Sequence, residues 1–399
     1  MFPRYPNFSF KAQSCANAGS ARLGEIITPH GVVKTPAFIF CATKGAMKAI
    51  AMPEMKAADT QIILSNTYHM MLQPGSELVQ KMGGLHKFCG WEGPLLTDSG
   101  GFQIFSLGHG SVSDEIKGKR SSGKGRSSVV KIKEEGASFR SYIDGKKWLL
   151  TPEQSIQVQR QLGADLIVVL DECTPFHVDK AYTKRSMEMS HRWALRSLAE
   201  FDKGNTHTQA LYGIIQGGIY EDLRQQSIDF VNDHDFFGHA IGGCLGEMEE
   251  QMNEITAFTA SRLRPDRPIH LLGVGTVRHI FSGVRQGIDT FDCVHPTRIA
   301  RHGGALVKGA PREHLQIRNA QYREDENPLE SDCACPTCQG YSRSYLHHLF
   351  KAKEILGMQL LTVHNVHFMN NLLKDIRKGL QEGTFSQVEN KWLNRKKSI

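Results

Sequence analysis

The chain lacks any run of eighteen or more apolar residues, the length at which a transmembrane helix becomes a candidate. Its first thirty residues also lack the apolar core of a secretory signal peptide. The sequence therefore predicts a soluble protein without a membrane segment. Its length of 399 residues would allow two or three domains, but a single α/β barrel also reaches this size.

The chain also lacks the even cysteine count of a disulfide scaffold. It has nine cysteines, and six of them are dispersed: Cys15, Cys41, Cys89, Cys173, Cys244 and Cys293. Free thiols at such spacings are more typical of a reducing cytoplasm than of a secreted protein. We therefore expect a cytoplasmic location.

The other three cysteines lie close together near the C-terminus. Cys333, Cys335 and Cys338 are followed, after a spacer of 25 residues, by His364. Three thiolates and one imidazole are the ligands of a closed tetrahedral zinc site, which stabilises a lobe and takes no part in chemistry. An iron–sulfur cluster is the alternative, although such clusters usually take four cysteines. Three other histidines are substitutes for the fourth ligand: His347, His348 and His367.

The formal net charge is +7, and the basic residues are clustered. One cluster lies within residues 117–133, a second contains Arg298, Arg301 and His302, and a third lies within residues 391–397. Each cluster alone is as consistent with solvated surface as with a binding site. Together with the chemistry described below, they favour an acidic polymer as the partner.

Short apolar, β-branched runs alternate with longer segments of helical period. We predict strands at residues 37–41, 61–65, 95–98, 164–171, 210–216, 239–242, 269–273 and 290–293. The helical segments between them are residues 53–58, 76–82, 152–162, 181–201, 220–232, 249–263 and 277–286. Eight strands separated in this way predict an irregular (β/α)8 TIM barrel. An open doubly wound sheet is the alternative, but the polar residues that end so many strands favour the barrel.

Three regions are expected along the chain. Residues 1–309 form the barrel, including a hairpin insertion at about residues 112–150 with its turn at Asp144-Gly145. A basic, Gly/Ser-rich stretch at residues 118–128 precedes the hairpin. Residues 310–365 form the zinc-binding subdomain, and residues 366–399 form a closing helix and a basic tail.

Polar residues follow six of the predicted strands. They are Asp98 to Gly101, Asp171-Glu172, Gln216 to Gly218, Gly242-Gly243, Gly273 to Gly275 and Asp292. In a barrel these strand ends meet at one mouth, where glycines let backbone groups approach a flat ligand. A single aspartate in such a place is as readily a helix cap, but six polar strand ends at one opening favour a binding site.

Two aspartates that face one bond suit glycosidic chemistry with retention. One attacks the anomeric carbon, and the other transfers a proton to and from the leaving group. The residues alone do not choose Asp98 and Asp292 over Asp171 or Asp289.

Five segments and the metal pattern resemble the tRNA-guanine transglycosylases, the queuine/preQ1 tRNA-ribosyltransferase family, in its bacterial-type form. The segments are residues 94–103 (PLLTDSGGFQ), 171–175 (DECTP), 213–218 (GIIQGG), 270–275 (HLLGVG) and 291–298 (FDCVHPTR). They occur in the order of the family and cover about residues 8–385. Each segment alone is weak, but together they are specific.

The resemblance implies a pentosyltransferase that replaces guanine at the wobble position of a tRNA anticodon, within a U-G-U loop. The incoming base is a 7-deazaguanine, queuine or preQ1, in queuosine modification. Asp292 matches the nucleophile that holds the ribose covalently, and Asp98 matches the general acid/base. Arg298 and Arg301 match residues that read the flanking uridines. A structural zinc ion and a homodimer are also implied.

The resemblance also implies a set of base-binding residues: Ser99, Phe102, Gln103, Asp171, Gln216, Gly243 and Leu272. Phe102 and Leu272 would sandwich the base, although core packing is the ordinary interpretation of such residues. Residues 244–247 form a loop one residue shorter than is usual in the family, and Leu272 replaces a frequent methionine. Both departures leave queuine and preQ1 open.

Two other functions remain as alternatives. One is a tRNA-binding subunit without catalysis, and the presence of both Asp98 and Asp292 argues against it. A metal-dependent barrel hydrolase would need its metal at the barrel mouth. We expect no appended RNA-binding domain after the metal lobe, and this expectation argues against the archaeal branch of the family.

Overall fold

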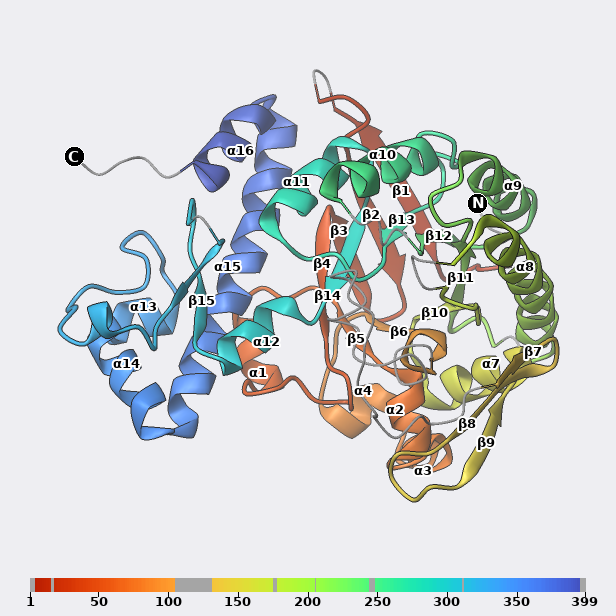
Figure 1. Cartoon of the computed structure of the whole chain (residues 1–399), viewed down its shortest axis with the longest axis horizontal. Coiled ribbons are helices and arrows are strands. Elements are labelled where there is room, and N and C mark those ends of the chain that lie inside the picture. The colour runs from red at the N-terminus through yellow and green to blue at the C-terminus, as the bar shows by residue number, and fades with distance from the viewer. Residues whose placement is uncertain are drawn as a thin grey trace.

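Eight parallel strands close a barrel in the order β10-β11-β12-β13-β14-β4-β5-β6 (Figure 1). The computed structural model describes residues 4–15, 18–104, 131–174, 178–204, 206–243, 248–310 and 312–394. The barrel strands are β4 (Ala37–Cys41), β5 (Ile63–Ser65), β6 (Leu95–Thr97), β10 (Leu166–Val168), β11 (Ala210–Ile215), β12 (Gly238–Ile241), β13 (Ile269–Leu271) and β14 (Thr290–Cys293). Each corresponds to one predicted strand, so the predicted barrel is confirmed and the doubly wound alternative is wrong.

The helices predicted between the strands are also present. They are α1 (Met52–Ala57), α3 (Ser76–Lys81), α7 (Pro152–Leu162), α8 (Lys180–Lys203), α9 (Glu221–Asp233), α10 (Glu249–Ala260) and α11 (Val277–Arg285). Within residues 1–309, three short helices of the described part were not predicted: α2 (Thr67–Leu72), α4 (Gly84–Cys89) and α12 (His295–Arg301). No helix among the described residues combines the length and apolar character needed to cross a bilayer.

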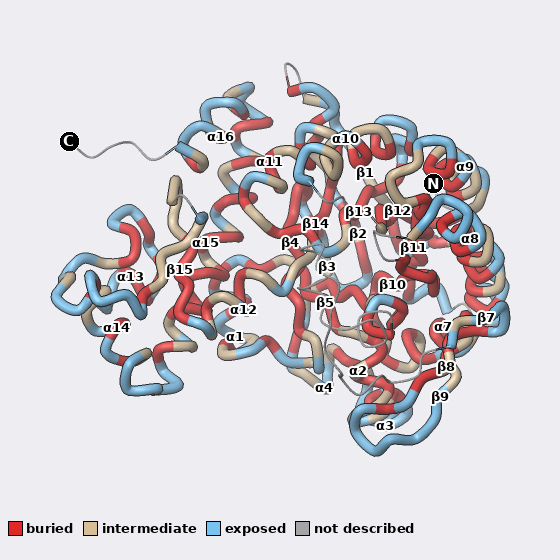
Figure 2. Tube along the Cα trace, in the orientation of Figure 1, coloured by how far each residue is buried: buried red, intermediate tan, exposed pale blue. Residues whose placement is uncertain are grey.

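The barrel strands form the centre of the core. β4 and β11 are buried along their whole length, and Figure 2 shows the buried residues concentrated in the strands and on the inner sides of the helices. Strands of a parallel sheet are covered on both faces, so they consist of continuous apolar runs. For this reason the strands show no alternation of apolar and polar residues, and they could be predicted as short apolar runs.

Two three-stranded antiparallel sheets lie outside the barrel in the described part of the chain. The first was not predicted from the sequence and consists of β1 (Ser9–Ser14), β2 (Arg22–Thr28) and β3 (Gly31–Thr35). The second consists of β7 (Lys131–Lys133), β8 (Gly136–Arg140) and β9 (Lys147–Leu150), and it contains the predicted hairpin with its turn at residues 144–145. The basic stretch at residues 118–128 lies outside the described residues.

The C-terminal lobe packs against the barrel through one long helix, α15 (Ile355–Glu382), with the lobe on one side of it and the barrel on the other (Figure 1). The lobe contains β15 (Gly304–Leu306), β16 (His314–Gln316), α13 (Pro336–Gly340) and α14 (Arg343–Ala352), and α16 (Phe385–Leu393) follows α15. The predicted closing helix began too late, because the helix starts at Ile355. The predicted division into residues 1–309, 310–365 and 366–399 stays a prediction.

One buried ion pair joins the N-terminal sheet to the bottom of the barrel. Arg22 in β2 donates to both carboxylate oxygens of Asp289, at 3.0 and 2.5 Å, and also to the carbonyl oxygens of Pro265 and Arg267. Asp289 directly precedes β14, and it accepts a hydrogen bond of 2.7 Å from the backbone N–H of Ile269, the first residue of β13. Arg22 therefore holds the N-terminal ends of two neighbouring barrel strands.

We predict that Arg22→Met destabilises the fold by about 3 to 5 kcal/mol, because it leaves the buried Asp289 carboxylate without its partner. The measurement is the free energy of unfolding in urea. The control is Lys56→Met, which breaks a surface pair between Lys56 and Glu92 whose side chains are 73% and 81% exposed. Equal, small effects of the two substitutions would show that the buried pair is not a structural link.

Candidate functional site

The predicted site residues lie at one end of the barrel, on or just after the C-terminal ends of its strands. Asp98 and Ser99 follow β6, Asp171 follows β10, Gln216 follows β11, Gly243 follows β12, Leu272 follows β13, and Asp292 lies within β14. Because the carboxyl ends of parallel barrel strands form one face, these side chains share a mouth. Gly243 is the last described residue before the loop at residues 244–247, which lies outside the described residues.

Asp98 is held by three hydrogen bonds. Its carboxylate accepts from Asn66 Nδ2 at 2.6 Å, from the backbone N–H of Thr67 at 2.8 Å and from Gln103 Nε2 at 2.6 Å. Burial raises the pKa of Asp98, the three hydrogen bonds lower it, and the charge of Asp292 raises it further. The net pKa lies above its usual value, so this carboxyl is suited to hold a proton and then release it.

The two oxygens of the Asp292 carboxylate have different surroundings. Oδ1 accepts a hydrogen bond of 2.9 Å from the backbone N–H of Gly273, and Nε2 of His270 lies 3.2 Å away, although the ring is not aligned for a hydrogen bond. Oδ2 has, among the described residues, only a 3.7 Å contact with the Cys41 thiol, which is a weak donor. One oxygen is therefore anchored, and the other remains available to a reacting atom.

Asp98 and Asp292 act on each other electrostatically. The charge of Asp292 contributes to the raised pKa of Asp98. Burial raises the pKa of the Cys41 thiol, and both carboxylates raise it further. The two carboxylates therefore belong to one site, in which the pKa of Asp98 is raised and Asp292 has the more accessible oxygen.

Asp171 and Gln216 form a polar edge next to this pair. Gln216 Nε2 donates a hydrogen bond of 2.5 Å to Asp171 Oδ2. Burial raises the pKa of Asp171 to about 6, against the lowering effect of Gln216. Glycine is required beside both residues: a Cβ at Gly101 would lie 2.6 Å from the Asp171 carbonyl oxygen, and one at Gly243 would lie 2.7 Å from Gln216 Oε1. This edge presents a carboxylate and an amide with little side-chain bulk around them.

The remaining predicted base-binding residues have distinct environments. Phe102 is 41% exposed, so its ring is not part of the core. Leu272 is half-buried against the core. Ser99 is buried and its hydroxyl accepts from the backbone N–H of Gly101 at 3.3 Å. Gln103 directs its amide group to Asp98, so it positions this carboxylate.

Helix α7 fixes the ends of the two strands that carry Asp98 and Asp171. Gln159 accepts from the Thr97 hydroxyl and the Val168 N–H, each at 3.0 Å, and donates to the Val168 carbonyl at 2.9 Å. Ser155 donates to the Ser99 carbonyl at 2.8 Å. These buried polar side chains bridge β6 and β10 from behind, a role that no local sequence pattern indicates.

Four cations lie beside the mouth. Arg298 and Arg301 are on α12, which directly follows β14, and Lys44 and Lys48 follow β4. Burial lowers the pKa of Lys48, and the charges of Arg301, Lys44 and Arg298 lower it further. The four groups therefore repel one another and form one positive patch, in which the two lysines were not predicted.

An aromatic group borders this patch. The Tyr142 ring from the hairpin insertion is 46% exposed, and Lys44 Nζ lies 5.5 Å from its centroid. The Tyr142 hydroxyl lies 3.0 Å from His69 Nδ1. Burial lowers the pKa of His69 to about 4, and Lys44 and Lys48 contribute to the lowering, so His69 is neutral at physiological pH.

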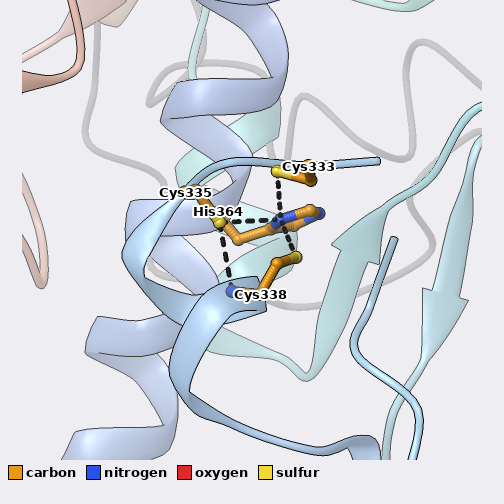
Figure 3. Close-up of side chains that lie close together, drawn as sticks. All are labelled: Cys333, Cys335, Cys338 and His364. Carbon is orange, nitrogen blue, oxygen red and sulfur yellow. Dashed lines mark hydrogen bonds between the residues drawn. The ribbon is translucent and has the colours of Figure 1, made fainter. Parts of the chain in front are cut away.

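Three cysteines and one histidine converge in the lobe (Figure 3). The sulfur atoms of Cys333, Cys335 and Cys338 lie 3.8, 3.5 and 3.4 Å from His364 Nδ1. His364 Nε2 donates to the Leu306 carbonyl at 2.8 Å, which leaves Nδ1 without a proton and free to coordinate. All four residues are buried, and together they can bind a metal ion.

The alternative histidine ligands are not part of this group. His347 Nδ1 lies 2.8 Å from the Ile317 carbonyl, His348 is exposed, and neither they nor His367 belong to the cluster. All three sulfurs lie within 3.8 Å of one nitrogen atom. That spacing leaves room for a single ion and not for a cluster of several irons.

Comparison with known proteins identifies the family. The family described as "Queuine tRNA-ribosyltransferase" matches residues 15–398. The chain belongs to this family. Among its relatives, the queuine tRNA-ribosyltransferase of Roseiflexus sp. (strain RS-1) is 46% identical over 384 residues, 94% of this chain and 96% of the relative. That of Caldanaerobacter subterraneus subsp. tengcongensis is 45% identical over 94% of each chain. That of Protochlamydia amoebophila is 44% identical over 94% of this chain and 96% of the relative.

Asn66 and Thr67 were not predicted as site residues, although they are polar residues at the end of a predicted strand. They directly follow β5, and the corresponding strand was predicted at residues 61–65. The rule that marked the other polar strand ends would have marked these two donors to Asp98 as well. Family membership thus agrees with a barrel mouth of paired carboxylates, a polar edge and a positive border.

We predict that Cys335→Ser loses the metal ion bound by this group of four residues, because a closed site needs all four ligands. Thermal stability should fall as well, since metal binding contributes folding free energy. The measurements are elemental analysis and thermal unfolding. Cys15→Ser, at a half-buried cysteine outside the cluster, is the control. Equal metal content in both variants would contradict the assignment.

We predict that Asp171→Asn changes stability in a pH-dependent way. The unfolded carboxyl ionises near pH 4 and the folded one at about 6, so the wild type loses roughly 3 kcal/mol of stability as the pH rises through this window. The amide variant has no such loss, and its stability relative to wild type should rise with pH. Urea unfolding at about pH 4 and about pH 7.5 measures this. A difference that stays constant with pH would refute the raised pKa.

Proposed function

We propose that this protein replaces the guanine at the wobble position of a tRNA anticodon with a 7-deazaguanine base, queuine or preQ1, in queuosine modification. The observation that carries the proposal is the pair of carboxylates at one barrel mouth, Asp98 and Asp292, in a chain of the queuine tRNA-ribosyltransferase family. The different surroundings of the two carboxylates suit a double displacement with retention at the sugar.

In the first step, Asp292 Oδ2 attacks C1′ of the ribose while the bond from C1′ to the guanine nitrogen breaks. Asp98, protonated beforehand, gives its proton to the departing guanine. The result is a ribosyl ester on Asp292 and an ionised Asp98. The hydrogen bond from the Gly273 N–H to Oδ1 orients the nucleophile throughout this step.

In the second step, the incoming base occupies the place of guanine. Asp98 removes a proton from its five-membered-ring nitrogen, which attacks C1′ from the same side and breaks the ester. Asp292 is released as a carboxylate and Asp98 is protonated again, so both groups return to their starting states. The donors from Asn66, Thr67 and Gln103 stabilise Asp98 in the interval when it is ionised.

The polar edge supplies recognition of the base. Asp171, ionised above its pKa of about 6, accepts from the amine and ring N–H groups of a guanine-like edge, and the Gln216 amide and the backbone at Gly243 add further hydrogen bonds. Ser99 lies next to Asp98 on the same strand end. The exposed Phe102 ring and the half-buried Leu272 are available to sandwich the heterocycle. The same contacts serve guanine, queuine and preQ1, so they do not choose between the incoming bases.

The positive patch supplies recognition of the RNA. Arg298 and Arg301 are placed on α12, one turn apart, next to the strand that carries Asp292, and we assign them to the uridines that flank the exchanged guanine. Lys44 and Lys48 suit phosphate contacts, which position RNA without reading its sequence. A wobble base is unpaired and costs little to splay into a pocket.

Zinc is the ion we propose for the lobe. A tetrahedral ion with Zn–S of about 2.3 Å and Zn–N of about 2.0 to 2.1 Å places each sulfur roughly 3.6 Å from the nitrogen, and the observed distances are 3.4 to 3.8 Å. The site is closed and buried, so the ion would brace the lobe without joining the chemistry. A barrel hydrolase would need its metal at the mouth. Among the described residues, neither group of side chains that could bind a metal ion lies there.

We further propose a homodimer. The lobe exposes the side chains of Tyr341, Tyr345, Ile355 and Leu356, and the two tyrosine rings stack with centroids 5.4 Å apart. Exposed large apolar side chains are typical of a protein interface when they lie together. Leu346 and Leu361 are fully buried, so they belong to the core of the lobe and not to such an interface. The cytoplasmic location stays a prediction from the cysteine pattern.

We predict that Asp98→Asn lowers the rate of guanine exchange by about 10² to 10⁴-fold, because the amide cannot transfer the proton, while the fold is retained. Asp292→Ala should abolish exchange. Incorporation of labelled guanine into tRNA measures both. Asp229→Asn, at an exposed position on α9, should leave exchange unchanged. Near-normal exchange by Asp98→Asn would remove its acid/base role.

We predict that Arg301→Ala costs about 1 to 3 kcal/mol of discrimination between U-G-U loops and loops with altered flanking bases. The measurement is kcat/KM on a set of anticodon stem-loops that differ only at those two positions. Arg278→Ala, at an exposed arginine on α11, is the control and should affect all loops equally. An unchanged preference in Arg301→Ala would refute the assignment of this arginine.

A further inference from the structure

A second group of metal-type ligands lies at the opposite end of the barrel from the mouth. It consists of His30, His86 and Asp165. His30 lies in the turn between β2 and β3, His86 is on α4, and Asp165 directly precedes β10. The residue before a barrel strand marks the N-terminal face, whereas the carboxylates of the mouth follow their strands. This group therefore plays no part in the proposed base exchange.

The three side chains point to one another. His30 Nδ1 lies 2.6 Å from Asp165 Oδ1. His86 Nε2 lies 3.3 Å from Asp165 Oδ2 and 3.1 Å from the carbonyl oxygen of Gly93. The two imidazole rings stack with centroids 3.6 Å apart and planes inclined by 14°. The Asp165 side chain is fully buried, and the His30 side chain is 40% exposed. The group is thus anchored inside and open to solvent on one side.

The charges of this group favour one bound metal cation over protonation of both imidazole rings. Both rings direct a nitrogen at the same carboxylate, and two protonated imidazoles stacked at 3.6 Å would repel each other. A single carboxylate compensates only one of them. One divalent ion bound by two neutral rings and Asp165 removes this repulsion and satisfies the buried carboxylate.

We propose that His30, His86 and Asp165 bind a divalent transition-metal ion of the zinc type. Two imidazoles and a carboxylate are ligands of intermediate softness that suit zinc, cobalt or nickel, and three protein ligands leave a coordination position for water. For ligand bonds of about 2.0 to 2.2 Å, tetrahedral neighbours lie roughly 3.4 Å apart. The observed 2.6 and 3.3 Å require a shift of less than about 1 Å from the exposed His30 side. Coordination by His86 Nε2 also replaces its 3.1 Å contact with the Gly93 carbonyl oxygen.

The proposed ion would stabilise the N-terminal face of the barrel. Asp165 already accepts a hydrogen bond of 2.9 Å from the backbone N–H of Leu95, the first residue of β6. Binding the same carboxylate to His30 and His86 ties the small N-terminal sheet and α4 to the start of two barrel strands. Residues on the N-terminal face of a barrel usually contribute to stability and not to catalysis.

Cobalt titration of the metal-free full-length protein tests the proposal, because Co²⁺ reports its ligands spectroscopically. The Cys333/Cys335/Cys338/His364 site gives a thiolate charge-transfer band, whereas a site of imidazole and carboxylate gives ligand-field bands without it. We expect two equivalents of Co²⁺ per chain, one of each type. Thermal unfolding with and without the second equivalent should show a higher Tm when it is bound.

His30→Gln is the decisive variant, since it keeps a hydrogen-bond donor near Asp165 and removes the imidazole. It should lose the equivalent without the thiolate band and the associated rise in Tm, and keep the other equivalent. His302→Gln, at an exposed histidine outside the group, should keep both. A single equivalent in the wild type, or a second equivalent that survives in His30→Gln, would overturn the proposal and leave a simple His–Asp pair.

Discussion

The chemistry of the barrel mouth depends on the different surroundings of two carboxylates, those of Asp98 and Asp292. The barrel closes where β14 pairs with β4, and this closure brings the end of β6 and the middle of β14 to one opening. Burial raises the pKa of Asp98, and the charge of Asp292 raises it further. The Gly273 N–H holds one Asp292 oxygen and leaves the other available. The two residues are both aspartates, but their different surroundings suit one to act as the acid and the other as the nucleophile.

The lobe contributes to the same site at a distance. His364, a ligand of the metal-type group, is followed on α15 by Asn365, whose amide donates to the carbonyl oxygens of Pro296 and Gly304 and accepts from the Leu306 N–H. Pro296 lies in α12, the helix of Arg298 and Arg301. An ion bound by His364 would thus fix the helix that carries the proposed RNA-reading arginines, which explains how a brace without chemistry can matter for substrate recognition.

Much of this arrangement could be predicted from the sequence, and the reasons for success and failure are physical. The barrel strands are short apolar blocks separated by helices, and Cys333, Cys335 and Cys338 are close in sequence, so local patterns sufficed. The N-terminal sheet was missed because its burial depends on a distant partner: Arg22 is held by Asp289. The roles of Gln159 and Lys44 arise from contacts between segments far apart in the chain, which no local pattern reveals.

The same limit applies within the mouth. Sequence alone left Asp98 and Asp292 equal to Asp171 and Asp289, and only their surroundings separate them: Asp289 is bound by Arg22 at the other end of the barrel, and Asp171 is engaged with Gln216. The most direct test of the account is to denature the enzyme during exchange, digest the RNA-linked protein and locate the modified residue by mass spectrometry. The account predicts a ribose-linked peptide modified at Asp292. Modification of any other residue, Asp98 included, would contradict it.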